Sequence, residues 1–191
     1  MRTSEIARKT KETDICAKLC LDGGDISVDT GIGFFDHMLE ALAKHAGFGL
    51  SLKVKGDLNV DCHHTVEDTG IVLGLAFAEA AGDKKGIARY GTAFIPMDEA
   101  LGFASVDISG RPFLVYDADM PQELIGQYDS CITAEFMRAF CYNALITAHI
   151  ICEYGDNAHH ITEALYKALA HALKAALKVE GQEILSTKGV I

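Results

Sequence analysis

Apolar residues recur at three- and four-residue intervals in four segments of the chain, which is the pattern of amphipathic helices. These segments are FFDHMLEALAKHAGF (34–48), residues 63–82, AEFMRAFCYNALITA (134–148) and a segment that starts at His159. The fourth is the clearest, because five apolar residues repeat every four positions among alanines and predict one strongly apolar face. They are Ile161, Leu165, Leu169, Leu173 and Leu177.

Strand-like segments lie before and between these helices. GLSLKVKG (49–56) alternates apolar and polar residues after the first helix, and HIICEYG (149–155) follows the third. TDICAKLCLDGG (13–24) and the β-branched and aromatic residues of 90–120 precede the first and third helices. The order is roughly ββαβα in each half, which predicts an α+β fold with helices packed on β-sheets.

The two halves also share a motif. DCHHTVEDTG contains His63, and NAHHITEALY contains His159, 96 residues later in a chain of 191. A repeat at half the chain length indicates an internal duplication. With the boundary in the polar segment GDKKGIARYG, we expect half-domains at 1–86 and 87–191 that form one functional unit.

Each copy of H-H-x-x-E opens a predicted helix, where the glutamate shares a face with both histidines. Adjacent histidines project about 100° apart, so one motif should serve two metal ions. If the motifs face one another across a pseudo-twofold axis, each ion takes one histidine from each motif and a glutamate. Imidazole and carboxylate ligands without thiolate suit Mn, Fe or Zn. A single such motif is more often a solvated histidine pair, but its duplication favours a metal site.

Composition excludes some partners. The net charge of −10 argues against non-specific binding to nucleic acid or to an anionic membrane. The start of the chain has no apolar segment after its basic residues, and no run of 18 apolar residues follows, so we expect a cytoplasmic protein. Six cysteines include no C-x-x-C pair and suit a reducing compartment, as small buried hydrophobes.

Seven blocks in ordered succession resemble the imidazoleglycerol-phosphate dehydratase family. They are GIGFFDHML, DCHHTVEDTG, KGIARYG, PMDEAL, DISGRP, NAHHITEALYKALAHAL and STKGV, which together span the chain. The resemblance implies a duplicated fold like domain 2 of ribosomal protein S5. It also implies a hydro-lyase of histidine biosynthesis that converts imidazole glycerol phosphate to imidazole acetol phosphate with two Mn²⁺ per site. The family assembles 24 subunits, with sites at subunit interfaces.

Eight metal ligands follow from the resemblance. They are His37, His63, His64, Glu67, Glu135, His159, His160 and Glu163. Some members carry histidine at the position of Glu135, and an acid in the first turn of a helix is also explained by the helix dipole. For His37 alone, a metal ligand and a core histidine are equal alternatives.

The resemblance also implies a set of phosphate-binding residues, to which arginine is suited by its planar fork. They are Arg89, Arg111, Lys167, Ser186 and Lys188. Ala41 departs from the family, because some members place a phosphate-contacting Gln there.

Dehydration needs a base after the hydroxyl has left, and Glu163 and Glu12 are the candidates. His45 corresponds to a histidine near the substrate. The alternatives for Glu12 and His45 are a charged strand-edge residue and a partly buried helical histidine. The rival functions are a dinuclear metal phosphoesterase, which would activate a water, and a metal-storage protein.

Overall fold

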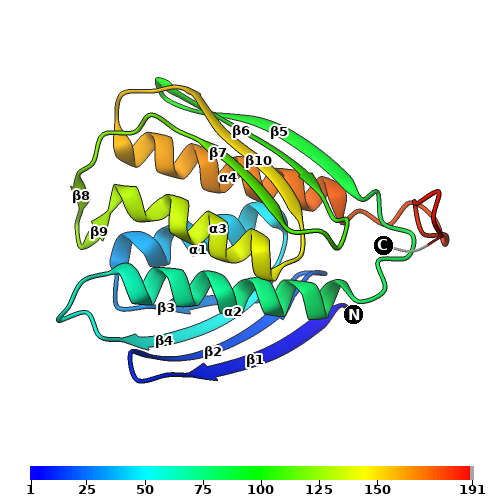
Figure 1. Ribbon diagram of the computed structural model, residues 1–191, viewed down its shortest axis with the longest axis horizontal. Coiled ribbons are helices and arrows are strands. Elements are labelled where there is room, and N and C mark those ends of the chain that lie inside the picture. The colour runs from blue at the N-terminus through cyan, green and yellow to red at the C-terminus, as the bar shows by residue number, and fades with distance from the viewer. Residues whose placement is uncertain (190–191) are drawn as a thin grey trace.

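Two four-stranded β-sheets enclose four α-helices in the computed structural model, which describes residues 1–189 (Figure 1). Val190 of the STKGV motif lies outside these residues. The first half runs β1 (Thr3–Lys9), β2 (Thr13–Cys20), β3 (Ile26–Asp29), α1 (Gly33–Ala46), β4 (Gly49–Gly56) and α2 (His63–Ala81). The second half runs β5 (Tyr90–Met97), β6 (Ala100–Asp107), β7 (Phe113–Asp117), α3 (Thr133–Asn143), β10 (Thr147–Tyr154) and α4 (Ala158–Ala176).

A short insertion separates β7 from α3. It contains β8 (Leu124–Ile125), β9 (Tyr128–Asp129) and the 3₁₀ helix η1 (Ser130–Ile132). The segment between α2 and β5 contains the predicted boundary, and its Ile87 forms an isolated β-bridge with Val179 near the C-terminus.

The two sheets have the same topology. Their strand orders are β1-β2-β4-β3 and β5-β6-β10-β7, and the last strand of each pairs in parallel while the others pair antiparallel. The main sheet of each half therefore has one strand more than the predicted ββαβα. The added strands β3 and β7 are four and five residues long, too short for a clear alternation. The shared topology agrees with the expected duplication.

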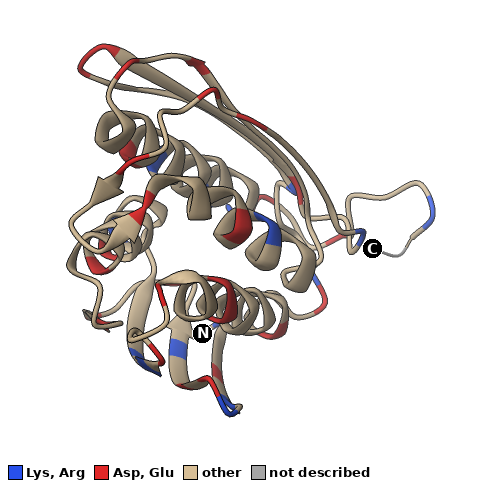
Figure 2. Cartoon of the chain, turned by 60° about the vertical axis from the view of Figure 1, so that its left-hand side comes forward, with Lys and Arg blue, Asp and Glu red and all other residues tan. Residues whose placement is uncertain are grey.

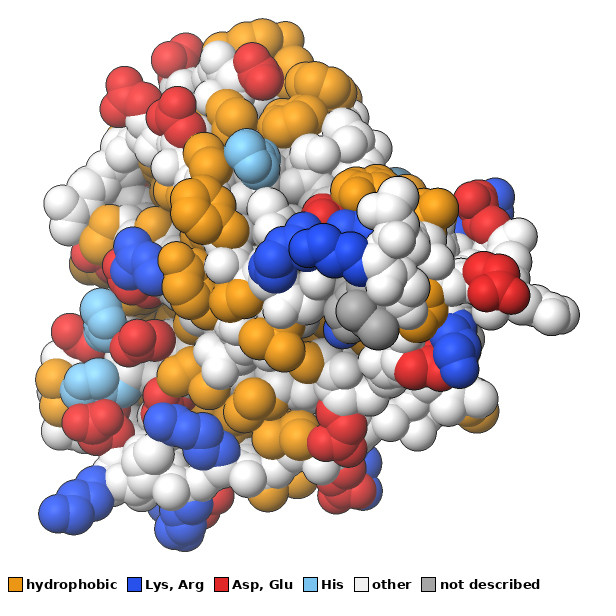
Figure 3. Space-filling model, turned by 45° about the vertical axis from the view of Figure 1, so that its right-hand side comes forward, with side chains coloured by type: hydrophobic (Ala, Val, Ile, Leu, Met, Phe, Trp, Pro, Cys, Tyr) orange, Lys and Arg blue, Asp and Glu red, His pale blue; other side chains and the backbone are white. Residues whose placement is uncertain are grey.

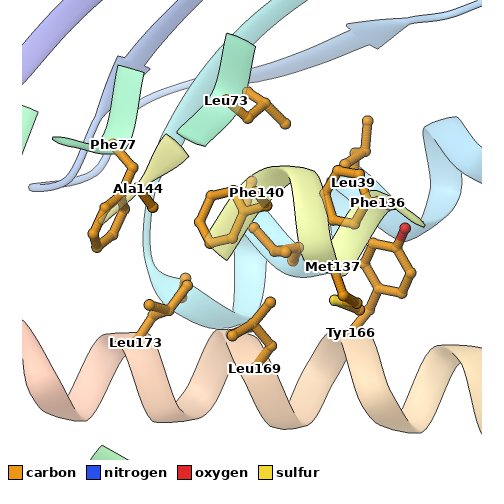
Figure 4. Close-up of a cluster of buried hydrophobic side chains, with 14 of the residues drawn as sticks. Leu39, Leu73, Phe77, Phe136, Met137, Phe140, Ala144, Tyr166, Leu169 and Leu173 are labelled. Atoms are coloured by element: carbon orange, nitrogen blue, oxygen red, sulfur yellow. The ribbon is translucent and has the colours of Figure 1, made fainter. Parts of the chain in front are cut away.

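One continuous hydrophobic core joins the halves, because the helices form the middle layer between the sheets. Helix α2 covers the first sheet, α4 covers the second, and α2 packs on α3 as α1 packs on α4. Figure 4 shows Phe136 and Phe140 of α3 between the side chains of α2 and those of α4. The apolar face predicted for α4 is buried along its whole length.

Helix α4 lies unusually close to its sheet at two glycines. A Cβ at Gly91 would come within 1.9 Å of the Ala172 carbonyl oxygen, and one at Gly102 within 2.7 Å of the Ala164 carbonyl carbon. These contacts hold α4 firmly, and with it the second histidine motif. No helix among the described residues has both the length and the apolarity needed to cross a bilayer.

All four helices start at the same end of the molecule, on the left in Figure 1. Both histidine motifs therefore lie at this end, while the C-terminal segment lies at the opposite one. Figure 2 brings the first end forward and shows acidic residues on the helices and loops around it.

Candidate metal centre

The first motif opens α2, and its two histidines diverge. Asp61 accepts a hydrogen bond from the His63 backbone N–H (2.7 Å) where the helix starts. The Nε2 of His63 lies 3.6 Å from Oε2 of Glu67, whereas Nδ1 of His64 lies 3.0 Å from Oδ2 of Asp57. The two rings are 6.2 Å apart and nearly perpendicular, at 76°. The motif thus presents its histidines in two directions, as the helical spacing predicts.

The second motif repeats this arrangement at the start of α4. Asn157 caps the helix by accepting hydrogen bonds from the backbone N–H groups of His159 (2.9 Å) and His160 (3.2 Å). His159 Nε2 lies 3.3 Å from Oε2 of Glu163, while His160 Nδ1 lies 2.6 Å from Oε2 of Glu99. The rings are 5.9 Å apart at 77°.

Helix α1 adds a third group to the second motif. Nε2 of His37 lies 3.7 Å from the same Glu163 Oε2 that faces His159. Two ligands that each bind one ion at about 2.1 Å, with an angle near 90–110°, lie about 3.0–3.4 Å apart. The His159–Glu163 distance of 3.3 Å falls within this range, and the His37–Glu163 distance of 3.7 Å lies just beyond it. The side chain of His37 is 55% exposed, which excludes the alternative of a core histidine. The donor set of His37, His159 and Glu163 fits the imidazole and carboxylate ligation expected for Mn²⁺.

Lys167 holds the other oxygen of Glu163, with its Nζ 2.5 Å from Oε1. Burial raises the pKa of Glu163, but the hydrogen bond and charge of Lys167, with His37 and His159, outweigh burial and leave this pKa below its ordinary value. Glu163 is therefore a carboxylate with Oε2 directed at two imidazoles. Lys167, expected at the substrate phosphate, is engaged here with the expected metal ligand.

The carboxylates beside His64 and His160 settle which ring nitrogen carries a proton. A carboxylate only accepts, so Nδ1 donates, and in the neutral imidazole Nε2 keeps its lone pair. The hydrogen bond that Asp57 accepts raises the pKa of His64, and the one that Glu99 accepts raises the pKa of His160. The same bond from His160, with backbone N–H donors, lowers the pKa of Glu99 to about 2.

Within one chain the two motifs form separate clusters. No hydrogen bond or ion pair of the described residues joins His63, His64 or Glu67 to the second motif. Across residues 1–189, no group of three or more His, Cys, Asp or Glu side chains is arranged to hold a metal ion by itself. The hypothesis that the motifs face one another across a pseudo-twofold axis inside one chain finds no support in this arrangement.

Three other expected site residues lie apart from one another. Glu135, in the first turn of α3, pairs with Arg138 one turn later, and no hydrogen bond or ion pair joins it to a histidine among the described residues. Oε1 of Glu12, in the β1–β2 turn, lies 3.9 Å from Nε2 of His64. His45, near the end of α1, has Nδ1 3.2 Å from Nε2 of His171 on α4.

Four of the five expected phosphate-binding residues line a single cavity of about 700 Å³. They are Arg89, Arg111, Ser186 and Lys188, with Tyr90 and the C-terminal segment completing the wall. The Arg89 side chain donates two hydrogen bonds to Asp107, at 2.7 and 3.2 Å, and a third to the Leu185 carbonyl oxygen at 2.6 Å. Figure 3 shows basic side chains gathered beside the C-terminal segment.

This cavity and the second motif lie at opposite ends of α4. The Arg89 backbone N–H donates to the Ala176 carbonyl oxygen at the last residue of the helix, whereas His159 is at its start. A helix of 19 residues is about 28 Å long. Neither end alone offers both metal-binding and phosphate-binding groups.

Comparisons with known proteins give this geometry a context. A sequence model of the family described as imidazoleglycerol-phosphate dehydratase matches residues 30–173. The imidazoleglycerol-phosphate dehydratase of Gluconobacter oxydans is 55% identical over 194 aligned positions, covering 100% of this chain and 98% of that protein. The enzyme of the same name from Methanosarcina mazei is 54% identical over 192 positions, with full coverage of both chains. This chain belongs to the imidazoleglycerol-phosphate dehydratase family.

Solved structures of imidazoleglycerol-phosphate dehydratases share the fold. The Staphylococcus aureus protein superposes with a TM-score of 0.85 at 39% identity and covers 93% of this chain and 99% of its own. The Pyrococcus furiosus protein, solved in complex with (S)-C348, has a TM-score of 0.85 at 38% identity, with 97% and 100% coverage. The resemblance and the α+β fold class are confirmed.

Four residues of the centre were not anticipated from the sequence. Asp57 and Glu99 bind the second histidine of each motif, while Asp61 and Asn157 accept backbone hydrogen bonds at the starts of α2 and α4. Asn157 had a readable signal, because it stands two residues before His159 at a helix start. No sequence signal reveals the roles of Asp57 and Glu99, which only the fold shows. Glu99 lies 61 residues from the histidine that it contacts.

Proposed function

We propose that this chain dehydrates imidazoleglycerol phosphate at di-manganese sites, each completed by a second copy of the chain. Family membership supports the reaction, which the names of the relatives describe. One observation supports the site: His37 and His159 converge on Glu163, while the first motif stays apart with His63 and Glu67. Both clusters offer imidazole and carboxylate ligands, and neither forms a complete metal site by itself among the described residues.

The separation along α4 supports the same assembly. The phosphate-binding cavity lies about 28 Å from the second motif, far beyond the reach of one small substrate. A copy of the chain that brings its Arg89 end to the motif end of another would supply both kinds of group. A closed homo-oligomer, for which we propose 24 subunits, provides such repeated contacts.

Manganese, when bound by these histidines and glutamates, would supply Lewis-acid polarisation of the substrate imidazole ring. The chain itself supplies the proton transfer. Both oxygens of Glu163 are engaged, one by Lys167 and the other by two imidazoles. The carboxylate of Glu12 is 53% exposed and lies 3.9 Å from His64. We therefore assign Glu12 as the base that removes the side-chain proton, and Glu163 as a ligand.

Phosphate recognition falls to Arg111, Ser186 and Lys188, with Arg89 holding the wall of the cavity. Arg111 is 65% exposed and only loosely paired with Asp107, at 3.6 Å, so its guanidinium is available to an anion. Lys167 pairs with Glu163 on α4, and His45 of α1 lies 3.2 Å from His171 of α4. We expect the cytoplasm as compartment, where all six cysteines would stay the free thiols that they are here.

The test is an assay of substrate turnover after removal of metal by a chelator, with and without added Mn²⁺. We expect Mn²⁺-dependent formation of imidazole acetol phosphate without release of inorganic phosphate. Glu12→Gln should abolish turnover, whereas Glu5→Gln, an exposed glutamate paired with Lys18, should not change it. Release of phosphate would favour the dinuclear phosphoesterase, and turnover independent of Mn²⁺ would overturn the proposal.

A further inference from the structure

We infer that Asp57 and Glu99 are positioning residues that hold the imidazoles of His64 and His160 with Nε2 free to bind a metal. The inference rests on the proposed function. In both cases the carboxylate accepts the Nδ1 proton, at 3.0 Å for Asp57 and 2.6 Å for Glu99. A histidine ligand that donates its other N–H to a carboxylate is fixed in tautomer and orientation. It also becomes a stronger electron-pair donor to the metal.

Glu99 is itself immobilised by the start of α4. Its Oε1 accepts hydrogen bonds from the backbone N–H groups of Asp156 (3.3 Å) and Asn157 (2.9 Å), while Oε2 binds His160. Asn157 then caps the helix that carries the motif. The β5–β6 turn, the helix start and the imidazole thus form one network, which leaves the ring a single orientation.

Asp57 fixes the ring of His64 in the same way, but from a different segment of the fold. It follows β4, and its two oxygens lie 3.2 and 3.0 Å from His64 Nδ1. The residue 96 positions later is Glu153, which makes no hydrogen bond to His160 among the described residues. The two carboxylates are therefore not copies produced by the duplication. Two unrelated segments supply the same contact to the second histidine of each motif.

These contacts divide the four histidines of the two motifs into two pairs with different orientations. His63 and His159 direct Nε2 at the glutamate of their own motif, so each contributes to the cluster of its own helix. His64 and His160 turn away from that glutamate and are locked by a carboxylate outside the motif. These two are the histidines oriented to complete a cluster on another copy.

Isosteric amides test this role. In Glu99→Gln the retained carbonyl oxygen keeps the backbone hydrogen bonds, while the new NH₂ faces Nδ1 and favours the tautomer with a proton on Nε2. Asp57→Asn makes the same change where the side chain binds only His64 among the described residues. Glu153→Gln removes an equal charge from an exposed position and is the matched control.

The measurement is titration of the chelator-treated proteins with MnCl₂, following the electron paramagnetic resonance signal of free Mn²⁺. We expect two Mn²⁺ per wild-type chain, and in Glu99→Gln and Asp57→Asn a loss of affinity of about 10–100-fold at one of the two. Thermal unfolding of the metal-free proteins should remain one cooperative transition, which shows that each variant folds. Should Glu99→Gln fail to fold, Asp57→Asn gives the result, because the Asp57 side chain accepts no backbone hydrogen bond among the described residues.

Affinities in Asp57→Asn and Glu99→Gln equal to that of Glu153→Gln would overturn the positioning role and leave the proposed function intact. A wild-type chain that neither binds Mn²⁺ nor consumes imidazoleglycerol phosphate would instead overturn the proposed function itself.

Discussion

Nζ of Lys167 lies 2.5 Å from Oε1 of Glu163, one turn earlier on α4, and the two side chains are only 19% and 9% exposed. The ion pair is therefore shielded from water on the face that α4 turns toward α1. It orients the one carboxylate that faces both His37 and His159. The cluster is held in shape by the chain before any metal binds.

Removing the charge of Lys167 should destabilise the metal-free chain. Lys167→Met leaves a mostly buried carboxylate without its partner, and we expect a loss of about 2–3 kcal/mol in the free energy of unfolding at pH 7. Because the pKa of Glu163 is lowered in the folded state, the ion pair stabilises the folded chain at pH values above the ordinary glutamate pKa of about 4.5. This stabilisation is lost as the pH falls below that value. The difference between variant and wild type should shrink in acid.

Urea unfolding at pH 7 and at pH 4 measures this effect. Arg138→Met is the control, since it breaks the more exposed pair with Glu135 and should cost less than about 1 kcal/mol. Equal stabilities of Lys167→Met and Arg138→Met at pH 7 would show that the Lys167 pair is not structural.

Substrate affinity should depend on the cavity at the far end of α4. Arg111→Ala and Lys188→Ala each remove a cation that our proposal places at the phosphate, and we expect KM to rise by about 10–100-fold, since a hydrogen bond to a charged group contributes about 1.5–3 kcal/mol. Steady-state kinetics separate this effect from kcat. Lys178→Ala, which removes a surface cation paired with Glu180, should leave KM unchanged. A fall in kcat alone would contradict the phosphate role.

His45 should make the stability depend on pH near neutrality. Burial lowers its pKa below the ordinary value of 6.5, as do the charges of His171, Lys167 and Lys44, while Glu163 acts in the opposite direction. The unfolded chain thus binds the proton more tightly. The contribution of neutral His45 to the free energy of unfolding is complete above pH 6.5 and is lost as the pH falls below this value.

We therefore expect wild-type metal-free protein to lose more stability between pH 7.5 and 5.5 than His45→Gln does. Denaturant unfolding at several pH values gives the comparison. His149→Gln removes an exposed imidazole on β10 and should retain the wild-type pH dependence. An identical pH dependence in His45→Gln and wild type would rule out His45 as the source.

Helices were the part of the fold most readily predicted. The period of four in Ile161, Leu165 and Leu169 depends only on local geometry, and these residues are fully buried. The duplicated motif likewise predicted histidines that diverge at two helix starts, because the divergence follows from the helical rotation. Strands β3 and β7 were missed because four or five residues pair in parallel with a distant strand.

The composition of the centre was less predictable. The pairing of His37 with Glu163 joins residues 126 positions apart and depends on how α1 packs on α4. From the spacing alone we predicted that the two motifs join in one site within the chain. The fold places four of the five expected phosphate-binding residues at the other end of α4. No local sequence pattern predicts how copies of the chain contact one another.

Subunit complementation tests the central claim, that each site joins clusters from different copies. One variant carries His63→Asn and His64→Asn, and the other carries His159→Asn and His160→Asn. Each should be inactive alone. After unfolding and refolding together in equal amounts, about one site in four should combine an intact first motif from one chain with an intact second motif from another and regain activity. A mixture as inactive as its components would contradict the claim, because a site built within one chain is broken in every subunit.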